Sequence, residues 1–193
     1  MVNGHAKGSE FERKICKDLS EWWTGGKRTD VFWRTAGSGA MAKTRSKTGG
    51  AAFGQYGDIQ AIDPIGQPLI DVCTLELKKG YNRTTIHDVL DATSKAKEQE
   101  FETFTRQAST DAQNAGSPFW MLITKRDRRL EMVTIPWGFY TLLRLKFKGL
   151  LGSSGTARLS DGRVFIMQLW EFLIRVCPSD ILEIRDASQT DEK

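Results

Sequence analysis

Hydrophobic residues near the start of the chain recur with helical spacing. Phe11 and Ile15 begin a series at intervals of four residues, which predicts an amphipathic helix over residues 8–23. At about 100° per residue, Glu12 falls inside the apolar arc of this helix and Glu10 falls on the opposite side. A carboxylate on the core side is costly unless a metal or a hydrogen-bond network receives it. Glu12 is therefore a candidate functional residue; the alternative is that it sits at a helix end and reaches water.

The pattern then changes to a short strand followed by a long polar segment. Residues 31–34 (VFWR) are a strand candidate, and residues 35–57 are rich in Gly, Ala, Ser and basic side chains. Such a composition cannot bury a core, so this segment is predicted to be a mobile basic loop. Ordering against a phosphate backbone and ordinary disorder both remain open for it.

Two strands are expected next, over residues 58–63 and 69–78, joined by a turn that contains two prolines and a glycine. If they pair as an antiparallel hairpin, Asp58 lies opposite Glu76 at about 5 Å. Alternation along the second strand places Lys78 on the same face as Glu76. The pattern therefore predicts two carboxylates and a lysine side by side.

The rest of the chain alternates between helical and extended patterns, which predicts an α/β fold with a mixed central sheet flanked by helices. A single domain over residues 1–193 is expected, with a frayed tail at 186–193. The aromatic side chains of the last third are assigned to core or interface, with core favoured. The expected elements are a helix from about His87 to Asn114, strands over 119–124 and 130–135, a helix over 136–151, a loop over 152–155, a strand over 164–167 and a helix over 169–176.

Charge adds an expectation about partners. The chain has 28 Lys and Arg against 24 Asp and Glu, a net charge of +4, and its first fifty residues hold ten basic and five acidic side chains. A basic N-terminal quarter is suited to phosphate contacts, and ordinary solvated lysines are the alternative. No apolar run approaches the length of a membrane span and no leader-like segment is seen, so the expected location is the cytoplasm.

Several kinds of site are disfavoured by the sequence. The three cysteines are far apart and the two histidines are isolated, which argues against structural zinc, a disulfide framework and histidine-based catalysis. Residues 37–44 (GSGAMAKT) are one residue short of a phosphate-binding P-loop. The residues that follow cannot form the apolar helix such a loop requires, so nucleotide hydrolysis is disfavoured as well.

The acidic residues indicate a different chemistry. Asp58, followed by Glu76-x-Lys78 on a later strand, is typical of metal-dependent phosphodiester hydrolysis. Two carboxylates can hold a divalent cation, and a lysine can orient or activate the attacking water. Charged residues are common in proteins, and the pattern does not fix the number of residues between Asp58 and Glu76. It is therefore informative only together with the motifs around it.

Four motifs follow one another along the chain: K-G-S-x-x-E-R at 7–13, R-x-x-x-S-G at 34–39, G-D-I at 57–59 and L-E-L-K at 75–78. They occur in the order seen in archaeal-type Holliday-junction resolvases, which are PD-(D/E)xK nucleases, and the chain resembles that family over nearly its whole length. Residues 133–137 (VTIPW) also resemble a segment of the family. Gly57 stands where the family usually has proline, and the loop before Asp58 looks longer than usual.

The resemblance implies a restriction-endonuclease-like fold and a Mg²⁺ site, with Mn²⁺ as a substitute. Direct metal ligands would be Asp58, Glu76 and the Leu77 backbone carbonyl, with Glu12 acting through water. Lys78 would be the catalytic lysine and Ser38 would lie near the scissile phosphate. Residues expected to contact DNA are Lys7, Arg13, Arg34, Lys43, Arg45, Lys47 and Gln99.

The expected function is therefore Mg²⁺-dependent endonucleolytic cleavage of DNA. The most specific form of this expectation is a junction resolvase that acts as a homodimer. Plain duplex and single-stranded DNA remain open as substrates. The alternative from another class is a nucleic-acid-binding module that keeps the fold without cleaving. The complete set of Asp58, Glu76 and Lys78 favours the enzyme.

Overall fold

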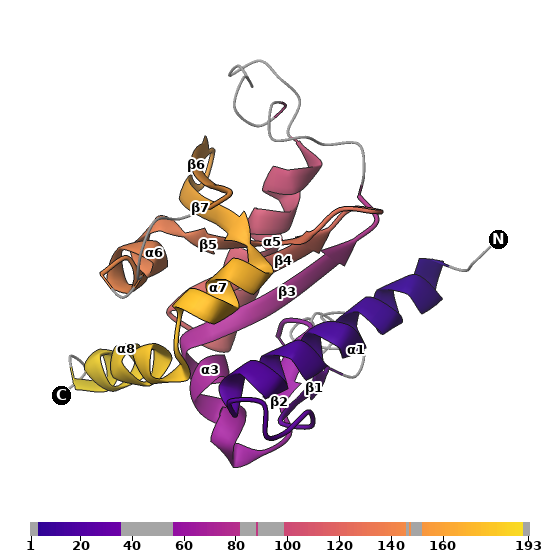
Figure 1. The fold of residues 1–193 in the computed structure, drawn as a ribbon. Helices are drawn as coiled ribbons and strands as arrows, with labels where there is room; N and C mark the ends of the chain where they lie inside the picture. Colours follow the sequence, from indigo (N-terminus) through magenta and orange to yellow (C-terminus); the bar gives the residue numbers. More distant parts are fainter. Residues whose placement is uncertain are drawn as a thin grey trace, which may run out of the picture.

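The computed structural model describes residues 4–35, 56–81, 88, 99–145, 147 and 152–190 (Figure 1). Helices and strands alternate along these residues, as the sequence pattern predicts. In chain order the elements are α1 (Gly4–Trp23), β1 (Phe32–Arg34), β2 (Ile59–Ala61), the 3-10 helix η1 (Pro64–Gly66), α3 (Gln67–Val72), β3 (Cys73–Lys79), α5 (Glu100–Ala115), β4 (Phe119–Lys125), β5 (Glu131–Pro136), α6 (Trp137–Leu143), β6 (Ser154–Leu159), β7 (Gly162–Gln168), α7 (Leu169–Arg175) and α8 (Pro178–Thr190).

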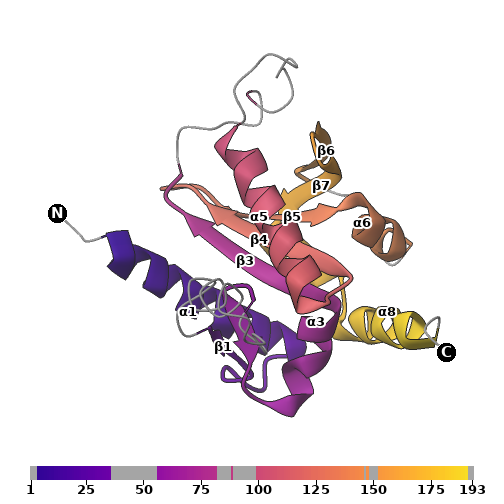
Figure 2. The ribbon, with the colours of Figure 1, turned by 180° about the vertical axis from the view of Figure 1, so that it is seen from behind.

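A five-stranded mixed sheet forms the centre of the molecule, with the strand order β3-β4-β5-β7-β6. β3 and β4 are parallel, and the other neighbours are antiparallel. α1 and α7 lie on one face of this sheet and α5 on the other (Figures 1 and 2). A separate antiparallel pair, β1 and β2, lies beside α1. The α/β class and the mixed sheet flanked by helices are confirmed.

Each face of the sheet packs against its own hydrophobic cluster. The larger cluster joins α1, through Ile15 and Leu19, to sheet residues such as Leu75. The smaller cluster joins Ala108 of α5 to Leu122 of β4. Since helices cover both faces, a strand such as β3 is buried along most of its length, and a charged side chain within it needs a partner.

The Ser20 hydroxyl fixes β1 against the end of α1. It donates to the carbonyl of Cys16 (2.7 Å) and accepts from the backbone N–H groups of Val31 (3.1 Å) and Phe32 (3.0 Å). Ser20 is buried, so these bonds satisfy backbone groups that water cannot reach. The start of β1 is thereby tied to the helix that carries Glu12.

The expected hairpin of residues 58–63 with 69–78 is wrong. Residues 67–72 form α3, and β2 pairs with β1 instead of β3. Pro68 lies in the first turn of α3, where its fixed φ favours a helix, and Leu69 and Val72 bury one face of it. The proline that suggested a turn is therefore a helix-start signal.

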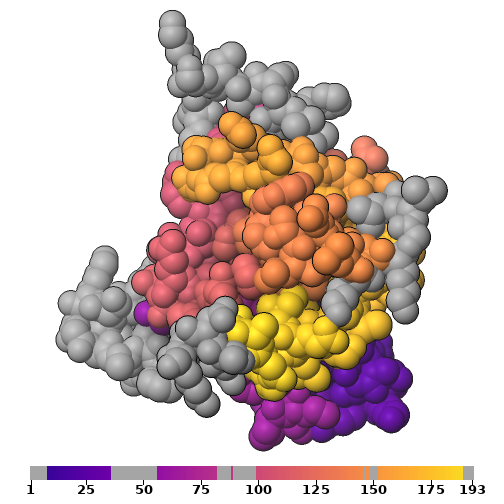
Figure 3. Space-filling model, turned by 90° about the vertical axis from the view of Figure 1, so that its left-hand side faces the viewer, coloured from indigo at the N-terminus to yellow at the C-terminus, as the bar shows by residue number. Residues whose placement is uncertain are grey.

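The C-terminal third differs from the expectation in three further places. α6 ends at Leu143, well short of 151. The expected loop at 152–155 leads into β6 (Ser154–Leu159), a mostly exposed edge strand of small and polar residues with little strand propensity. Of the expected frayed tail at 186–193, residues 186–190 belong to α8, which Pro178 begins and which buries Ile181, and residues 191–193 lie outside the described residues. Figure 3 shows α6 (orange) and α8 (yellow) side by side on one face of the molecule.

Within the described ranges no helix is long and apolar enough to cross a membrane.

Candidate active site

Asp58 lies against the outer edge of β3, the edge that faces away from β4. Its backbone N–H donates to the carbonyl of Leu75 (2.7 Å), and its Oδ2 accepts from the N–H of Leu77 (2.8 Å). These two bonds bracket Glu76, the residue between them. Asp58 and Glu76 are therefore neighbours, as the sequence predicted, although not through the hairpin that the prediction assumed.

Gly57 allows Asp58 to approach β3 so closely. Its φ is +77°, and a Cβ at this position would lie 2.7 Å from the Leu75 carbonyl oxygen and 2.9 Å from Thr74 Cγ2. Any side chain at this position would be strained by the positive φ and would clash with these two atoms. The glycine that replaces the usual proline is thus required by the local geometry.

Glu76 is the most deeply buried carboxylate of the site, with 2% of its surface exposed. Its Oε1 accepts from Lys78 Nζ and from Gln107 Nε2, each at 2.6 Å. Burial raises the pKa of Glu76 to about 7, and the nearby charge of Asp58 adds to this rise against the opposing effect of Lys78. Two carboxylates share a site that one lysine does not neutralise.

Lys78 remains positively charged in this environment. Burial alone would lower its pKa, but the charge and hydrogen bond of Glu76 outweigh burial, so the pKa of Lys78 is raised. Its Nζ also lies 5.5 Å from the centre of the Phe104 ring, which in turn contacts Tyr81 edge to face at 4.5 Å. A cationic lysine can stabilise negative charge but has no lone pair to act as a base.

Glu12 faces the site from α1. Its Oε2 pairs with Arg34 Nε at 3.0 Å, and Arg34 Nη1 donates to Ser9 Oγ at 2.5 Å. Burial raises the pKa of Glu12, Arg34 lowers it and Asp58 raises it again, so the net shift is upward. Glu10 is exposed, which confirms the orientation predicted from helical phase.

The outer edge of β3 also presents a backbone acceptor. Residues of a strand direct their N–H and C=O groups to the same side, and the N–H of Leu77 points at Asp58. The Leu77 carbonyl therefore faces the same side, as expected of a metal ligand. Among the described residues no group of three or more His, Cys, Asp or Glu side chains is arranged to hold a metal. A metal here would bind two carboxylates, a carbonyl and waters, with Glu12 held away by Arg34.

The DNA contacts expected from sequence are only partly described. Lys43, Arg45 and Lys47 lie outside the described residues, and so does Ser38, the residue expected near the scissile phosphate. Lys7 falls within α1 and Arg13 is exposed on it. Gln99 lies at the N-terminal cap of α5, where its backbone N–H donates to Glu102 Oε2 at 3.4 Å.

Two residues of α5 that the sequence did not single out reach the site. Gln107 donates to Glu76, and the buried Asp111 also raises the pKa of Glu76. They are four residues apart and so lie on one face of the helix. This spacing is visible in the sequence, but nothing in the sequence shows that this face turns toward β3.

A scan against protein-family models finds one described as "Phage putative PDDEXK endonuclease", which matches residues 3–157. This span contains every residue of the candidate site. It supports the PD-(D/E)xK superfamily inferred from the motifs and agrees with the mixed sheet flanked by helices. The narrower likeness to archaeal-type resolvases stays a prediction. No curated protein and no solved structure matched the chain.

Replacing Gly57 with alanine should destabilise the protein and displace Asp58. We expect the free energy of unfolding to fall by about 2 kcal/mol or more, since strain at positive φ adds to the clash with Leu75. Urea unfolding followed by circular dichroism measures this. Gly138→Ala is the control: its Cβ would lie 3.7 Å from Phe119, inside α6, so stability should stay equal or rise. Equal stability of the two variants would contradict the role given to Gly57.

Proposed function

The chain belongs to the phage PDDEXK endonuclease family, and we propose that it is a metal-dependent endodeoxyribonuclease that hydrolyses phosphodiester bonds at the outer edge of β3. The observation that carries the proposal is the position of Asp58. Its two hydrogen bonds to β3 bring it beside Glu76, whose Oε1 is held by Lys78 and Gln107.

The donor set fits Mg²⁺, with Mn²⁺ as a substitute. Asp58, Glu76 and the Leu77 carbonyl offer hard oxygen ligands, and a divalent cation would relieve the repulsion that helps to raise the pKa of Glu76. Both hydrogen bonds to Glu76 fall on Oε1, which would leave Oε2 for a metal. The bound metal would supply an activated water and polarise the phosphate.

The protein's own groups have separate roles in this proposal. Lys78, held charged by Glu76, would stabilise the negative charge that develops on the phosphate. Gln107 is a positioning residue that fixes the Glu76 carboxylate. Glu12, already paired with Arg34, would contact the metal through water. The hydrogen bonds to Glu76 and the pairing of Glu12 with Arg34 would hold these groups in fixed orientations, which would lower the cost of reorganisation during reaction.

A module that binds nucleic acid without cleaving remains the alternative from another class. The pattern of burial argues against it. A carboxylate of which 2% is exposed, with another carboxylate beside it, is a costly arrangement to keep for binding alone.

Wild-type protein with Mg²⁺ should nick supercoiled plasmid DNA, and Asp58→Ala should reduce the rate by at least about a hundredfold, because a metal ligand is lost. Gel electrophoresis of the plasmid over time measures the rate. Asp71→Ala removes an exposed carboxylate on α3 and should cut like wild type. No cleavage by wild type, or equal cleavage by Asp58→Ala, would rule out the enzyme.

Mg²⁺ affinity should rise with pH through the pKa of Glu76. With a pKa of about 7, Glu76 is mostly protonated below that pH and mostly ionised above it. Because the metal requires the ionised carboxylate, we expect binding to be about tenfold weaker at about pH 6 than at about pH 8. Isothermal titration calorimetry with Mg²⁺ measures both values. Glu76→Gln should bind Mg²⁺ weakly at either pH. A wild-type affinity for Mg²⁺ that does not change with pH would contradict the proposal that Glu76 is a metal ligand.

The narrowest form of the proposal is a junction resolvase, and its support is the order of the four sequence motifs. We expect a four-way junction to be cut at least about tenfold faster than linear duplex of the same sequence, a barrier difference of about 1.4 kcal/mol. Paired incisions need two active sites, so the species that cuts junctions should be a homodimer by light scattering. Equal rates on the two substrates would contradict the preference for junctions, while the proposal of endonuclease activity would stand.

A further inference from the structure

The turn between β4 and β5 is strongly basic. It runs over residues 126–129 (Arg-Asp-Arg-Arg), here called the arginine turn, and lies between Lys125 at the end of β4 and Glu131 at the start of β5. Arg128 and Arg129 are exposed and Arg126 is half-buried. This cluster is shorter than the basic N-terminal quarter, which holds ten Lys and Arg residues.

The parallel pairing of β3 and β4 brings the arginine turn next to the candidate active site. Lys78 pairs with Thr124 and Lys79 with Lys125, and the N–H of Gly80 donates to the Lys125 carbonyl at 2.9 Å. The hairpin of β4 and β5 ends beyond the arrowhead of β3 in both views (Figures 1 and 2). Generic strand spacings put the Cα of Arg126 roughly 8 Å from that of Lys78.

The backbone of the turn is unfavourable for arginine. Arg128 has φ of +57°, and it is the one non-glycine residue with positive φ in the described part of the chain. The turn is closed by a bond from the N–H of Arg129 to the carbonyl of Arg126 at 3.2 Å. A side chain in this conformation costs on the order of 1 kcal/mol, which glycine would avoid. Stability therefore does not explain an arginine at position 128.

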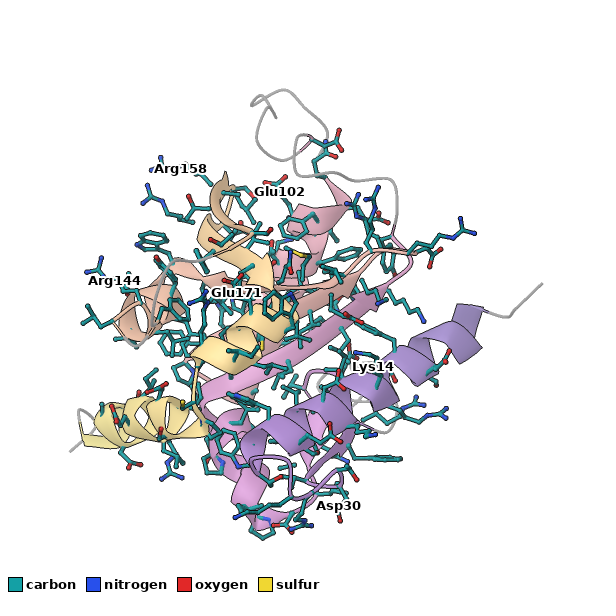
Figure 4. The ribbon with its side chains drawn as sticks, in the orientation of Figure 1. Lys14, Asp30, Glu102, Arg144, Arg158 and Glu171 are labelled. Carbon is teal, nitrogen blue, oxygen red and sulfur yellow. The ribbon has the colours of Figure 1, made fainter. Side chains whose placement is uncertain are left out.

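The charged side chains at the base of the hairpin pair with one another. Glu131 accepts from Lys125 at 2.6 Å and pairs with Lys14 of α1 at 3.3 Å (Lys14 is labelled in Figure 4). Burial raises the pKa of Glu131, but the bond from Lys125 and the charge of Lys14 contribute to a net lowering. The arginines beyond this base form no ion pair with an acid among the described residues. Their positive charge lies in the turn that joins β4 to β5.

We propose that the arginine turn binds the DNA backbone beside the phosphate that is cut. The inference rests on the proposed nuclease function and adds the surface that holds the substrate. Guanidinium groups bind phosphate oxygens in a bidentate manner, and such contacts fix register without reading sequence. The β4–β5 hairpin pairs directly with β3, the strand that carries Lys78. Its arginines would hold neighbouring phosphates of the DNA while the scissile phosphate lies at Asp58 and Glu76.

The test is DNA binding by Arg128→Gly combined with Arg129→Ala, measured by fluorescence anisotropy with a labelled duplex, without divalent metal, over a series of KCl concentrations. We expect affinity at low salt to fall about tenfold or more, and the slope of log affinity against log salt to flatten by about 1 to 2. Arg128→Gly alone should weaken binding with an equal or higher melting temperature, because glycine suits this φ.

Arg144→Ala with Arg158→Ala is the charge-matched control. Both arginines are exposed and lie away from the turn of the β4–β5 hairpin (Figure 4). Arg144 lies at the end of α6, and Arg158 lies on β6, at the edge of the sheet opposite β3. This control should bind nearly as wild type does. Wild-type affinity and slope in the arginine-turn variant, or equal losses in both double variants, would overturn the inference.

Cleavage separates this inference from the proposed function. If wild type binds through the arginine turn but never cuts with Mg²⁺, the catalytic proposal fails and the binding surface stands. If the arginine-turn variant cuts as fast as wild type at every salt concentration, the binding surface fails and the catalytic proposal stands.

Discussion

The arrangement of the site depends on two hydrogen bonds by which Asp58 docks on the outer edge of β3. They join two parts of the fold that no continuous sheet connects: the β1–β2 pair beside α1 and the five-stranded central sheet. The same aspartate is both the residue that makes this junction and the proposed metal ligand. Its carboxylate uses Oδ2 to hold Leu77, which fixes its orientation before any ligand arrives.

Two ion pairs flank Asp58. Glu76 with Lys78 comes from the central sheet, and Glu12 with Arg34 comes from α1 and β1. Because Glu12 and Glu76 each have a cation beside them, the cost of bringing these two carboxylates close to Asp58 is reduced. Burial is the largest cause of the raised pKa of Glu12 and of Glu76, and the charge of Asp58 raises both further. The proposed divalent cation would favour the ionised form of these carboxylates.

Local periodicity predicted the residues whose neighbours lie on the same element. Helical phase separated Glu12 from Glu10, and strand alternation placed Lys78 beside Glu76. It could not predict the route of the chain between Asp58 and Glu76, because a proline that begins a short helix resembles one that makes a turn. It also missed Gln107, whose contact with Glu76 depends on how α5 packs across β3. Tertiary packing decides these positions, and a single sequence records it only indirectly.

The parallel pairing of β3 with β4 has a consequence for how the protein folds. The hairpins of β4 with β5 and of β6 with β7 join segments that are close in sequence and can close quickly. β3 and β4 are separated by residues 80–118, so their pairing carries a larger entropic cost of loop closure. Gln107 of α5 lies within this intervening segment, so its hydrogen bond to Glu76 also joins residues that are far apart in sequence. A partly folded chain that lacks this pairing would leave the Glu76 carboxylate without the contact that fixes its position.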